Sequence, residues 1–240
     1  MPSSNSRMLE SLFDQCKIDI KRGALFDTRP PAMPEGFDFS RIEGMMLGLA
    51  IGDSLGNTTE SMLPKNRRDA FGEIRDYLPN NHASGKTIGL PTDDTQLAFW
   101  TLEQMIEDGH FNPDHVVKRL SRNRIFGIGS SVAQFLSNYN SGRTWYESGP
   151  KSSGNGALMR IAPILVPHLK LATSDLWVDA ALCAMITHND SGSIGACLSF
   201  VNILWHLLLM ESPPEPFWWL KTYVKVAREL ELDETYEPRG

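Results

Sequence analysis

Residues 91–109 read PTDDTQLAFWTLEQMIEDG, and this stretch decides which kind of fold the chain can adopt. Apolar side chains recur at helical spacing after Asp93, which predicts one helix over residues 93–108 with a buried face. Gly109 follows the last periodic residue and is typical of a helix end. The apolar face consists of Leu97, Phe99, Trp100, Leu102, Met105 and Ile106. The stretch therefore favours a helical core.

The same periodicity continues on both sides of this helix. Asn112 as the capping residue and Pro113 as the first helical residue indicate where the next helix begins. Strand alternation is scarce, and we find no repeat of fixed period. The fold class that this predicts is all-α, a compact helical bundle. Its further predicted helices cover residues 41–55, 113–122, 130–139, 157–167, 174–187, 192–210 and 216–231.

The composition excludes several classes of protein. The chain has 240 residues, which fits one large domain or two small ones. It carries 23 Lys and Arg against 29 Asp and Glu, a net charge of −6, whereas a nucleic-acid-binding surface needs a basic excess. Cys16, Cys183 and Cys197 lack the spacing of a zinc site or a disulfide framework. We therefore expect free thiols in a reducing cytoplasm and no nucleic-acid partner.

Residues 191–210 form an uncharged run of nearly membrane-spanning length. Polar residues interrupt this run at Ser193, Asn202 and His206. We therefore expect a buried core helix and no membrane association.

Residues 1–37 are predicted to form an extension joined to a main domain over residues 38–240. Prolines at positions 30, 31 and 34 forbid regular structure at the end of this extension. Its apolar side could pack on the chain's own domain or could engage a partner. Met8, Leu9, Leu12, Phe13, Ile18 and Ile20 make up that side.

Glycines at positions 44, 48, 52 and 56 share one face of the predicted helix over residues 41–55. Each glycine costs about 1 kcal/mol of helix stability relative to alanine, so something must offset the loss. One explanation is close packing of another helix. The other is a backbone at Gly52-Asp53-Ser54 that approaches a ligand. Glu60 follows in the next loop, near enough in sequence to reach the same place.

Thr92-Asp93-Asp94-Thr95 places two adjacent carboxylates and two hydroxyls where the helix over residues 93–108 begins. Helix N-termini favour Asp through capping and the helix dipole, so a well-capped helix is one interpretation. One Asp suffices for capping, however, and consecutive residues point in different directions. Carboxylate and hydroxyl oxygens suit Mg²⁺ or Ca²⁺ better than zinc. The other interpretation is therefore a site for a hard cation.

Two further segments carry weaker signals. Ser152-Ser153-Gly154-Asn155-Gly156 precedes a predicted helix, and its glycines allow positive φ. Backbone N–H groups in such a loop can bind an anion such as phosphate, although a plain turn has the same pattern. Thr187-His188 closes the predicted helix over residues 174–187, a place where a lone histidine is commonly structural.

Taken in order, these four segments resemble the ADP-ribosylglycohydrolase family. Its opening signature is similar to Gly48-x-Ala50-x-Gly52-Asp53-Ser54-Leu55-Gly56 with Glu60, and its first metal-binding motif to Thr92-Asp93-Asp94-Thr95. Its loop around ADP-ribose is similar to Ser152-x-Gly154-Asn155-Gly156-Ala157-x-Met159-Arg160, and its later ligand-contacting pair to Thr187-His188. Each motif is modest alone, but four of them in order over residues 44–188 are specific.

The resemblance implies an all-α orthogonal fold, one or two bound Mg²⁺ ions, and removal of ADP-ribose from a modified protein side chain, with arginine expected. It implies that Thr92, Asp93 and Asp94 hold magnesium, and that Asp93 or Asp94 is the catalytic base. Glu60 lies where some members keep a catalytic or gating glutamate. The implied substrate-binding residues are Gly52, Asp53, Ser152, Gly154, Asn155, Gly156 and His188.

The sequence departs from the family at one point. Members usually carry a second acidic motif, Gly-Asp-Thr-Asp-Thr, near their C-terminus, and no such string occurs here. The sequence is then either a fragment or a naturally shortened member, with a half-built metal site and exposed apolar helix faces. Three functions remain open. They are a Mg²⁺-dependent hydrolase, an immunity-type protein whose residues 1–37 block an ADP-ribosyltransferase toxin, and an ADP-ribose binder without turnover.

Overall fold

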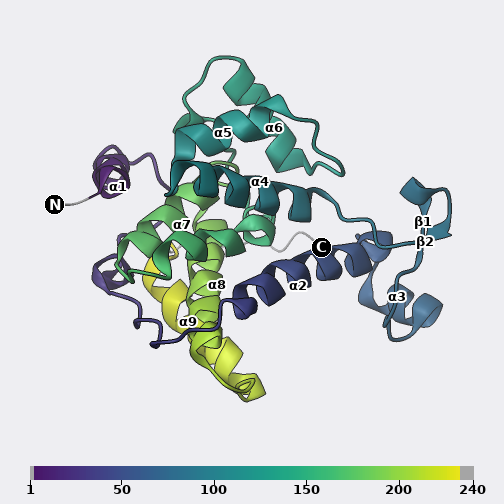
Figure 1. Cartoon of the computed structure of the whole chain (residues 1–240). Helices are drawn as coiled ribbons and strands as arrows, with labels where there is room; N and C mark the ends of the chain where they lie inside the picture. Colours follow the sequence, from purple (N-terminus) through teal and green to yellow (C-terminus); the bar gives the residue numbers. More distant parts are fainter. Residues whose placement is uncertain (1–2, 233–240) are drawn as a thin grey trace.

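The computed structural model of the chain describes residues 3–232, apart from the side chain of Asn81. Helices dominate this range, so the all-α prediction is confirmed (Figure 1). The α-helices are α1 (Ser4–Asp14), α2 (Ser40–Gly56), α3 (Pro64–Phe71), α4 (Asp93–Asp108), α5 (Pro113–Arg122), α6 (Ser130–Asn140), α7 (Asp175–Met185), α8 (Ser191–Leu209) and α9 (Pro216–Leu230). Short 3₁₀ helices cover Ala24–Asp27, Asn57–Thr59, Asn81–Ala83, Trp145–Glu147, Leu158–Arg160 and Ala162–His168. Strands β1 (Pro79–Asn80) and β2 (Lys86–Thr87) pair antiparallel in a small hairpin.

Local signals place the ends of the central helices correctly. Helix α4 covers the predicted residues 93–108 and ends at Gly109, whose φ of +73° is the left-handed conformation that glycine adopts readily. Asn112 caps α5, because its side chain accepts hydrogen bonds from the backbone N–H groups of Asp114 and His115. Both ends were readable from the sequence because caps depend on neighbouring residues only.

The core forms around α7 and α8. Helix α8 packs against both α7 and α9, while α4 lies against the 3₁₀ helices after residue 157. Trp177 of α7 and Trp205 of α8 are among the largest fully buried side chains. Helix α8 is long and apolar enough to cross a membrane, a property that core helices of soluble proteins share. Most of its residues are buried inside the fold, as predicted for a core helix.

The predicted helix over residues 157–167 is wrong in type. This segment forms two 3₁₀ helices, Leu158–Arg160 and Ala162–His168, instead of one α-helix. Pro163 and Pro167 lie in the second of them. Because proline lacks a backbone N–H and clashes with the preceding turn, it disfavours a continuous α-helix here.

The extension packs on its own domain. Leu9 and Leu12 of α1 are buried against α7, and Ile18 and Ile20 belong to the same hydrophobic core. The Asn5 side chain donates hydrogen bonds to the Phe111 carbonyl at 2.9 Å and to Oδ1 of Asp179 at 2.7 Å. The apolar side of the extension therefore packs on the chain's own domain, the first of the two predicted alternatives. The domain boundary near residue 37 stays a prediction.

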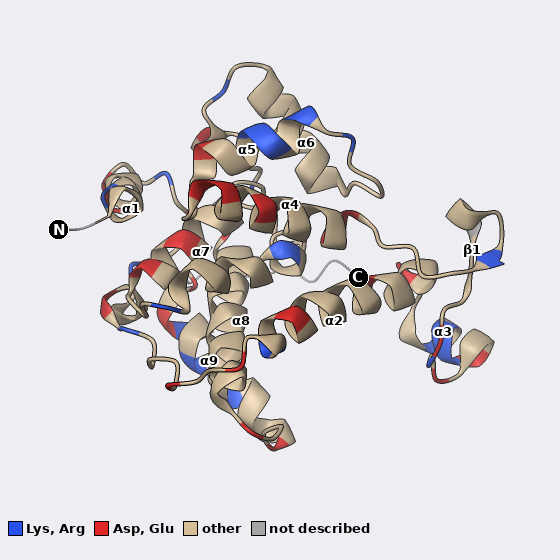
Figure 2. Cartoon of the chain, in the orientation of Figure 1, with Lys and Arg blue, Asp and Glu red and all other residues tan. Residues whose placement is uncertain are grey.

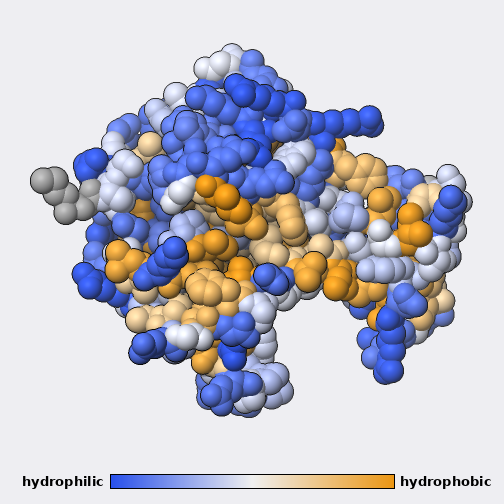
Figure 3. All heavy atoms as spheres, in the orientation of Figure 1, coloured by the Kyte–Doolittle hydropathy of each residue, from blue (hydrophilic) through white to orange (hydrophobic). Residues whose placement is uncertain are grey.

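Helix α2 extends away from the core, with α3 and the hairpin at its far end (Figure 1). Its outer face is apolar and open, since Leu47 is 60% exposed and Ile51 is 49% exposed (Figure 3). A Cβ atom at any of its glycines, at 44, 48, 52 and 56, would meet no atom within 4 Å. Close helix packing therefore does not explain these glycines within the described chain. The predicted exposed apolar helix faces are confirmed on α2 and on α9, where Leu220 is also exposed.

Charged side chains are unevenly distributed over the helices. Helices α4 and α7 carry Asp and Glu without Lys or Arg, whereas Lys and Arg predominate on α5 (Figure 2). All three cysteines are free thiols, with Cys16 exposed and Cys183 and Cys197 buried.

The burial of α1 predicts that residues 3–37 unfold together with the rest of the chain. Leu9→Ala should lower the free energy of unfolding by about 2–5 kcal/mol, because it leaves a cavity in the core. Urea denaturation followed by circular dichroism measures this change. Leu171→Ala is the control, since Leu171 is exposed. Equal stabilities of the two variants would show that α1 is not part of the cooperative core.

Candidate active site

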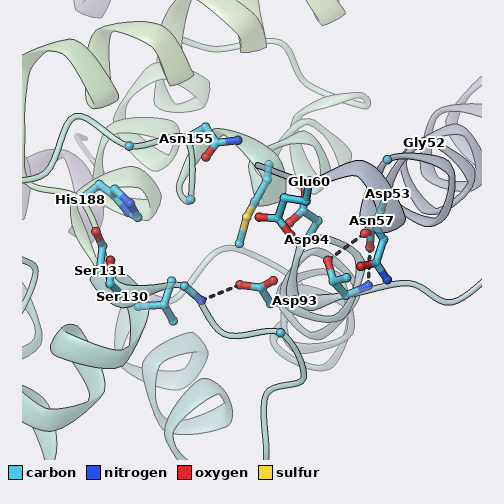
Figure 4. A pocket seen from close by; sticks show the side chains of 18 residues that line it. Gly52, Asp53, Asn57, Glu60, Asp93, Asp94, Ser130, Ser131, Asn155 and His188 are labelled. Atoms are coloured by element: carbon cyan, nitrogen blue, oxygen red, sulfur yellow. Dashed lines mark hydrogen bonds between the residues drawn. The ribbon is translucent and has the colours of Figure 1, made fainter. Parts of the chain in front are cut away.

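Segments that lie far apart in the sequence meet around a cavity of about 430 Å³ (Figure 4). The end of α2, the start of α4, the start of α6, the loop before residue 157 and the turn after α7 each contribute to its wall. A volume in this range suits a small-molecule ligand. The lining residues are Gly52, Asp53, Gly56, Asn57, Glu60, Thr92, Asp93, Asp94, Gly127, Gly129, Ser130, Ser131, Val132, Gly154, Asn155, Gly156, Met159 and His188.

Every candidate residue from the sequence lines this cavity except Ser152. The Ser152 hydroxyl lies 2.8 Å from the Ser131 hydroxyl and accepts a hydrogen bond from the Gly154 backbone N–H at 3.4 Å. It therefore supports the loop that carries Gly154 instead of facing the cavity.

Sequence reasoning missed the wall formed by the start of α6. Gly127, Gly129, Ser130, Ser131 and Val132 line the cavity there. The sequence contains a signal for this wall, because Gly127 and Gly129 directly precede the predicted helix over residues 130–139. The loop over residues 152–156 has the same pattern. Asn57 and Met159 were also missed. Asn57 directly follows the motif that ends at Gly56, and Met159 lies within the motif over residues 152–160.

Asp53 of α2 holds the start of α4 in place. Its Oδ2 accepts hydrogen bonds from the backbone N–H groups of Thr92 at 2.7 Å and Thr95 at 3.2 Å, and from the Thr95 hydroxyl at 2.6 Å. Its Oδ1 accepts the Thr92 hydroxyl at 2.8 Å. Asp53 therefore accepts the Thr95 N–H, one of the free N–H groups in the first turn of α4, and the N–H of the capping residue Thr92. The carboxylates of Asp93 and Asp94 line the cavity.

The acidic end of the cavity is electrostatically crowded. Asp93 is 6% exposed, and its Oδ2 accepts the Gly129 backbone N–H at 3.3 Å. Burial raises the pKa of Asp93, with smaller contributions from the charges of Glu60 and Asp53. Burial raises the pKa of Asp94 to about 6, helped by the charges of Asp53, Asp93 and Glu60. The lining residues include no lysine or arginine that would offset this negative charge.

The oxygen atoms at the acidic end are of the kind that binds a hard cation. The Thr92 hydroxyl donates its proton to Asp53, so its lone pairs remain free beside the carboxylates of Asp93 and Asp94. Such oxygen donors are the ligands that Mg²⁺ prefers. Within residues 3–232, however, no group of three or more His, Cys, Asp or Glu side chains is placed to hold a metal ion. Thr92, Asp93 and Asp94 could therefore supply only part of the coordination shell of a metal ion.

The opposite end of the cavity offers hydrogen-bond donors. His188 is 2% exposed and faces the loop over residues 154–156. Burial, together with the nearby charge of Arg160, lowers the pKa of His188 to about 4, so the ring is neutral at pH 7. The ring explains Gly156, because a Cβ atom there would lie 2.6 Å from Cε1 of His188. Neither Gly154 nor Gly156 has a positive φ, so the expected conformational reason for these glycines is wrong.

Comparisons with known proteins agree with the sequence motifs. A sequence model of the family described as ADP-ribosylglycohydrolase matches residues 34–237. An uncharacterized protein from Archaeoglobus fulgidus is 34% identical over 164 residues, which is 66% of this chain and 53% of that protein. ADP-ribosylarginine hydrolase Tri1 from Serratia proteamaculans is 27% identical over 205 residues, which is 79% of this chain and 53% of the relative.

Two further relatives extend this picture. ADP-ribosyl-[dinitrogen reductase] glycohydrolase from Rhodospirillum rubrum is 29% identical over 70% of this chain and 58% of its own length. A solved structure described as an ADP-ribosylglycohydrolase-related protein complex matches with a TM-score of 0.57 and 27% identity, over 69% of this chain and 55% of that one. This chain spans about half the length of the curated relatives that it matches.

The crowded carboxylates predict a pH-dependent cost to stability. A raised pKa means that the fold disfavours the charged form of Asp94, so the cost is present at pH 7.5 and disappears as the pH falls through about 6 towards 4. Asp94→Asn should therefore raise the free energy of unfolding by about 1 kcal/mol at pH 7.5, after allowance for solvent screening. Chemical denaturation in the presence of EDTA measures this change.

The matched control is Asp69→Asn on α3, which removes an exposed carboxylate that does not line the cavity. Its stability should stay close to that of the wild type at every pH. The electrostatic explanation would be contradicted if Asp94→Asn were no more stable than Asp69→Asn at pH 7.5.

Proposed function

The chain belongs to the ADP-ribosylglycohydrolase family, and we propose that it is a Mg²⁺-dependent hydrolase that removes ADP-ribose from modified arginine side chains of proteins. The cavity supports this proposal, because an acidic end and an end rich in hydrogen-bond donors lie within one site. Arginine is the proposed side chain because the relative Tri1 is named an ADP-ribosylarginine hydrolase.

The two ends suit different parts of ADP-ribose. Neutral donors suit the negatively charged diphosphate, and the loop over residues 154–156, the Ser131 hydroxyl and His188 lie together at one end (Figure 4). The carboxylates suit the ribose hydroxyls and a cationic guanidinium. A diphosphate held at the donor end would fix the ribose beside Asp93 and Asp94, so that binding energy from a remote group orients the reacting carbon.

The acidic end would hold the magnesium. Thr92, Asp93 and Asp94 are its proposed ligands, and the remaining coordination positions require further donors. Magnesium bound there would orient the ribose hydroxyls and a water molecule and would relieve the repulsion between the carboxylates.

The reaction requires a base and stabilisation of positive charge. Water adds to the ribose carbon as the bond from that carbon to the guanidine nitrogen breaks, and the guanidine leaves with a proton. Positive charge develops on the sugar in such a cleavage, and nearby carboxylates stabilise it. Of the two candidate bases we favour Asp94, because the Asp93 carboxylate already accepts a hydrogen bond from the Gly129 backbone N–H.

One observation favours a second candidate function. Because the described residues do not form a complete metal site by themselves, this chain could bind ADP-ribose without hydrolysing it. No observation favours the toxin-blocking function, since the apolar side of residues 3–37 is buried in the chain's own core. That function and the cytoplasmic location stay predictions.

Release of ADP-ribose from an arginine-ADP-ribosylated protein tests the proposal. We expect release with Mg²⁺ and none with EDTA, and a loss of at least about 100-fold in the initial rate for Asp94→Asn, the typical contribution of a general base. Asp69→Asn should retain the wild-type rate. Release that survives both EDTA and Asp94→Asn would contradict the proposal.

A parallel calorimetric titration with ADP-ribose separates the two candidate functions. Binding together with Mg²⁺-dependent release supports the hydrolase. Binding with no release under any condition supports the ADP-ribose binder and contradicts the hydrolase. If the protein neither binds nor releases ADP-ribose, both candidate functions are contradicted.

A further inference from the structure

Arg160 is a buried cation to which the proposed function gives no role. Its side chain is 0% exposed, and the described residues give it no carboxylate partner. It donates hydrogen bonds to the Cys183 Sγ at 3.1 Å and to the Cys183 carbonyl at 2.8 Å. A third donated bond reaches the Thr187 hydroxyl at 2.8 Å. Arginine is almost never fully buried unless it is paired, so its presence here requires an explanation.

The Thr187 hydroxyl connects Arg160 to His188. Thr187 is itself 0% exposed, and its Oγ1 lies 2.9 Å from Nδ1 of His188. A guanidinium group can only donate hydrogen bonds, so Oγ1 must accept the bond from Arg160. The hydroxyl proton then needs an acceptor of its own, and Nδ1 of His188 is the one that the described residues provide.

The alternative arrangement leaves a buried proton without a partner. If Nδ1 of His188 carried the proton, the Thr187 oxygen would accept two hydrogen bonds and its own proton would face no acceptor. A buried donor without an acceptor is strongly disfavoured where water has no access. The network therefore selects the neutral tautomer in which Nδ1 is bare and Nε2 carries the proton.

We infer that Arg160 and Thr187 are positioning residues that fix the tautomer of His188, so that its Nε2–H is presented to the ligand as a hydrogen-bond donor. This inference rests on the proposed function only for the identity of the ligand, the diphosphate of ADP-ribose. A bare Nε2 would instead turn a lone pair towards an anionic oxygen and would repel it.

The surroundings of the ring support this orientation. Cβ atoms built at Gly154 and Gly156 would lie 3.5 Å and 3.0 Å from Nε2, so the Nε2 edge of the ring lies along the loop that lines the cavity. The close-up view shows the ring directed into the cavity, on the same side as Ser131 (Figure 4). The low pKa of His188 agrees with this role, because a neutral ring keeps a single, fixed donor across the neutral pH range. His188 is thus assigned as a hydrogen-bond donor to the ligand.

The ¹⁵N resonances of the histidine side chains test the inference in the ligand-free protein at pH 7.5. They distinguish a protonated ring nitrogen from a bare one, and the spectrum of His188→Gln identifies the His188 signals. We expect a protonated Nε2 and a bare Nδ1 in the wild type. Thr187→Val should lose this preference and give a tautomer mixture, whereas Thr187→Ser should restore the wild-type pattern.

Thr101→Val is the matched control. Thr101 is also buried, but its hydroxyl donates to the Leu97 carbonyl within α4 and does not contact the site. The affinity for ADP-ribose should fall about tenfold in Thr187→Val, a change of about 1.4 kcal/mol. It should remain near the wild-type value in Thr187→Ser and in Thr101→Val.

A protonated Nδ1 in wild-type His188 would overturn the inference, and this spectrum needs no variant to fold. An unchanged tautomer in a folded Thr187→Val protein would overturn it as well. Because the spectrum is recorded without ligand, metal or turnover, its result does not depend on hydrolysis. A fixed Nε2–H tautomer in a protein that releases no ADP-ribose would contradict the proposed function alone.

Discussion

The site depends on the hydrogen bonds that Asp53 accepts from Thr92 and Thr95. They join the end of α2 to the start of α4, and both carboxylate oxygens take part. A helix start needs acceptors for its free N–H groups, and Asp53 supplies one of them for Thr95 from another helix. This contact fixes the start of α4, where Asp93 and Asp94 line the cavity. It therefore fixes where α2 lies relative to the two carboxylates at the start of α4.

The cavity has two electrostatically different ends, one with carboxylates and one with neutral hydrogen-bond donors. At one end, burial raises the pKa values of Asp93 and Asp94, with smaller contributions from neighbouring carboxylates. At the other end, a neutral histidine and backbone groups offer hydrogen-bond donors. A site that is strained in the absence of ligand is common where function requires charge in a confined space. Each end gains most from a ligand that carries the complementary group.

Buried polar contacts connect the sequence motifs to one another. Arg160 from one motif reaches Thr187 from another, and Thr187 in turn orients His188. The ring of His188 then determines that residue 156 must be glycine, since any side chain there would collide with it. These residues act as one unit although no single motif contains them all.

The sequence by itself determined the helical class and the bounds of α4 and α5, because periodicity and capping depend on near neighbours. It also identified part of the cavity wall, the acidic residues and the loop over residues 154–156, but not the start of α6. Only the tertiary structure decided how the apolar side of residues 3–37 is covered, that Asp53 caps α4, that Ser152 supports its loop, and which proton His188 carries. The contacts behind the Asp53 and His188 assignments link residues 39 positions apart, from Asp53 to Thr92, and 27 apart, from Arg160 to Thr187. Local pattern holds no information about such contacts, because they form only when the packed helices bring distant segments together.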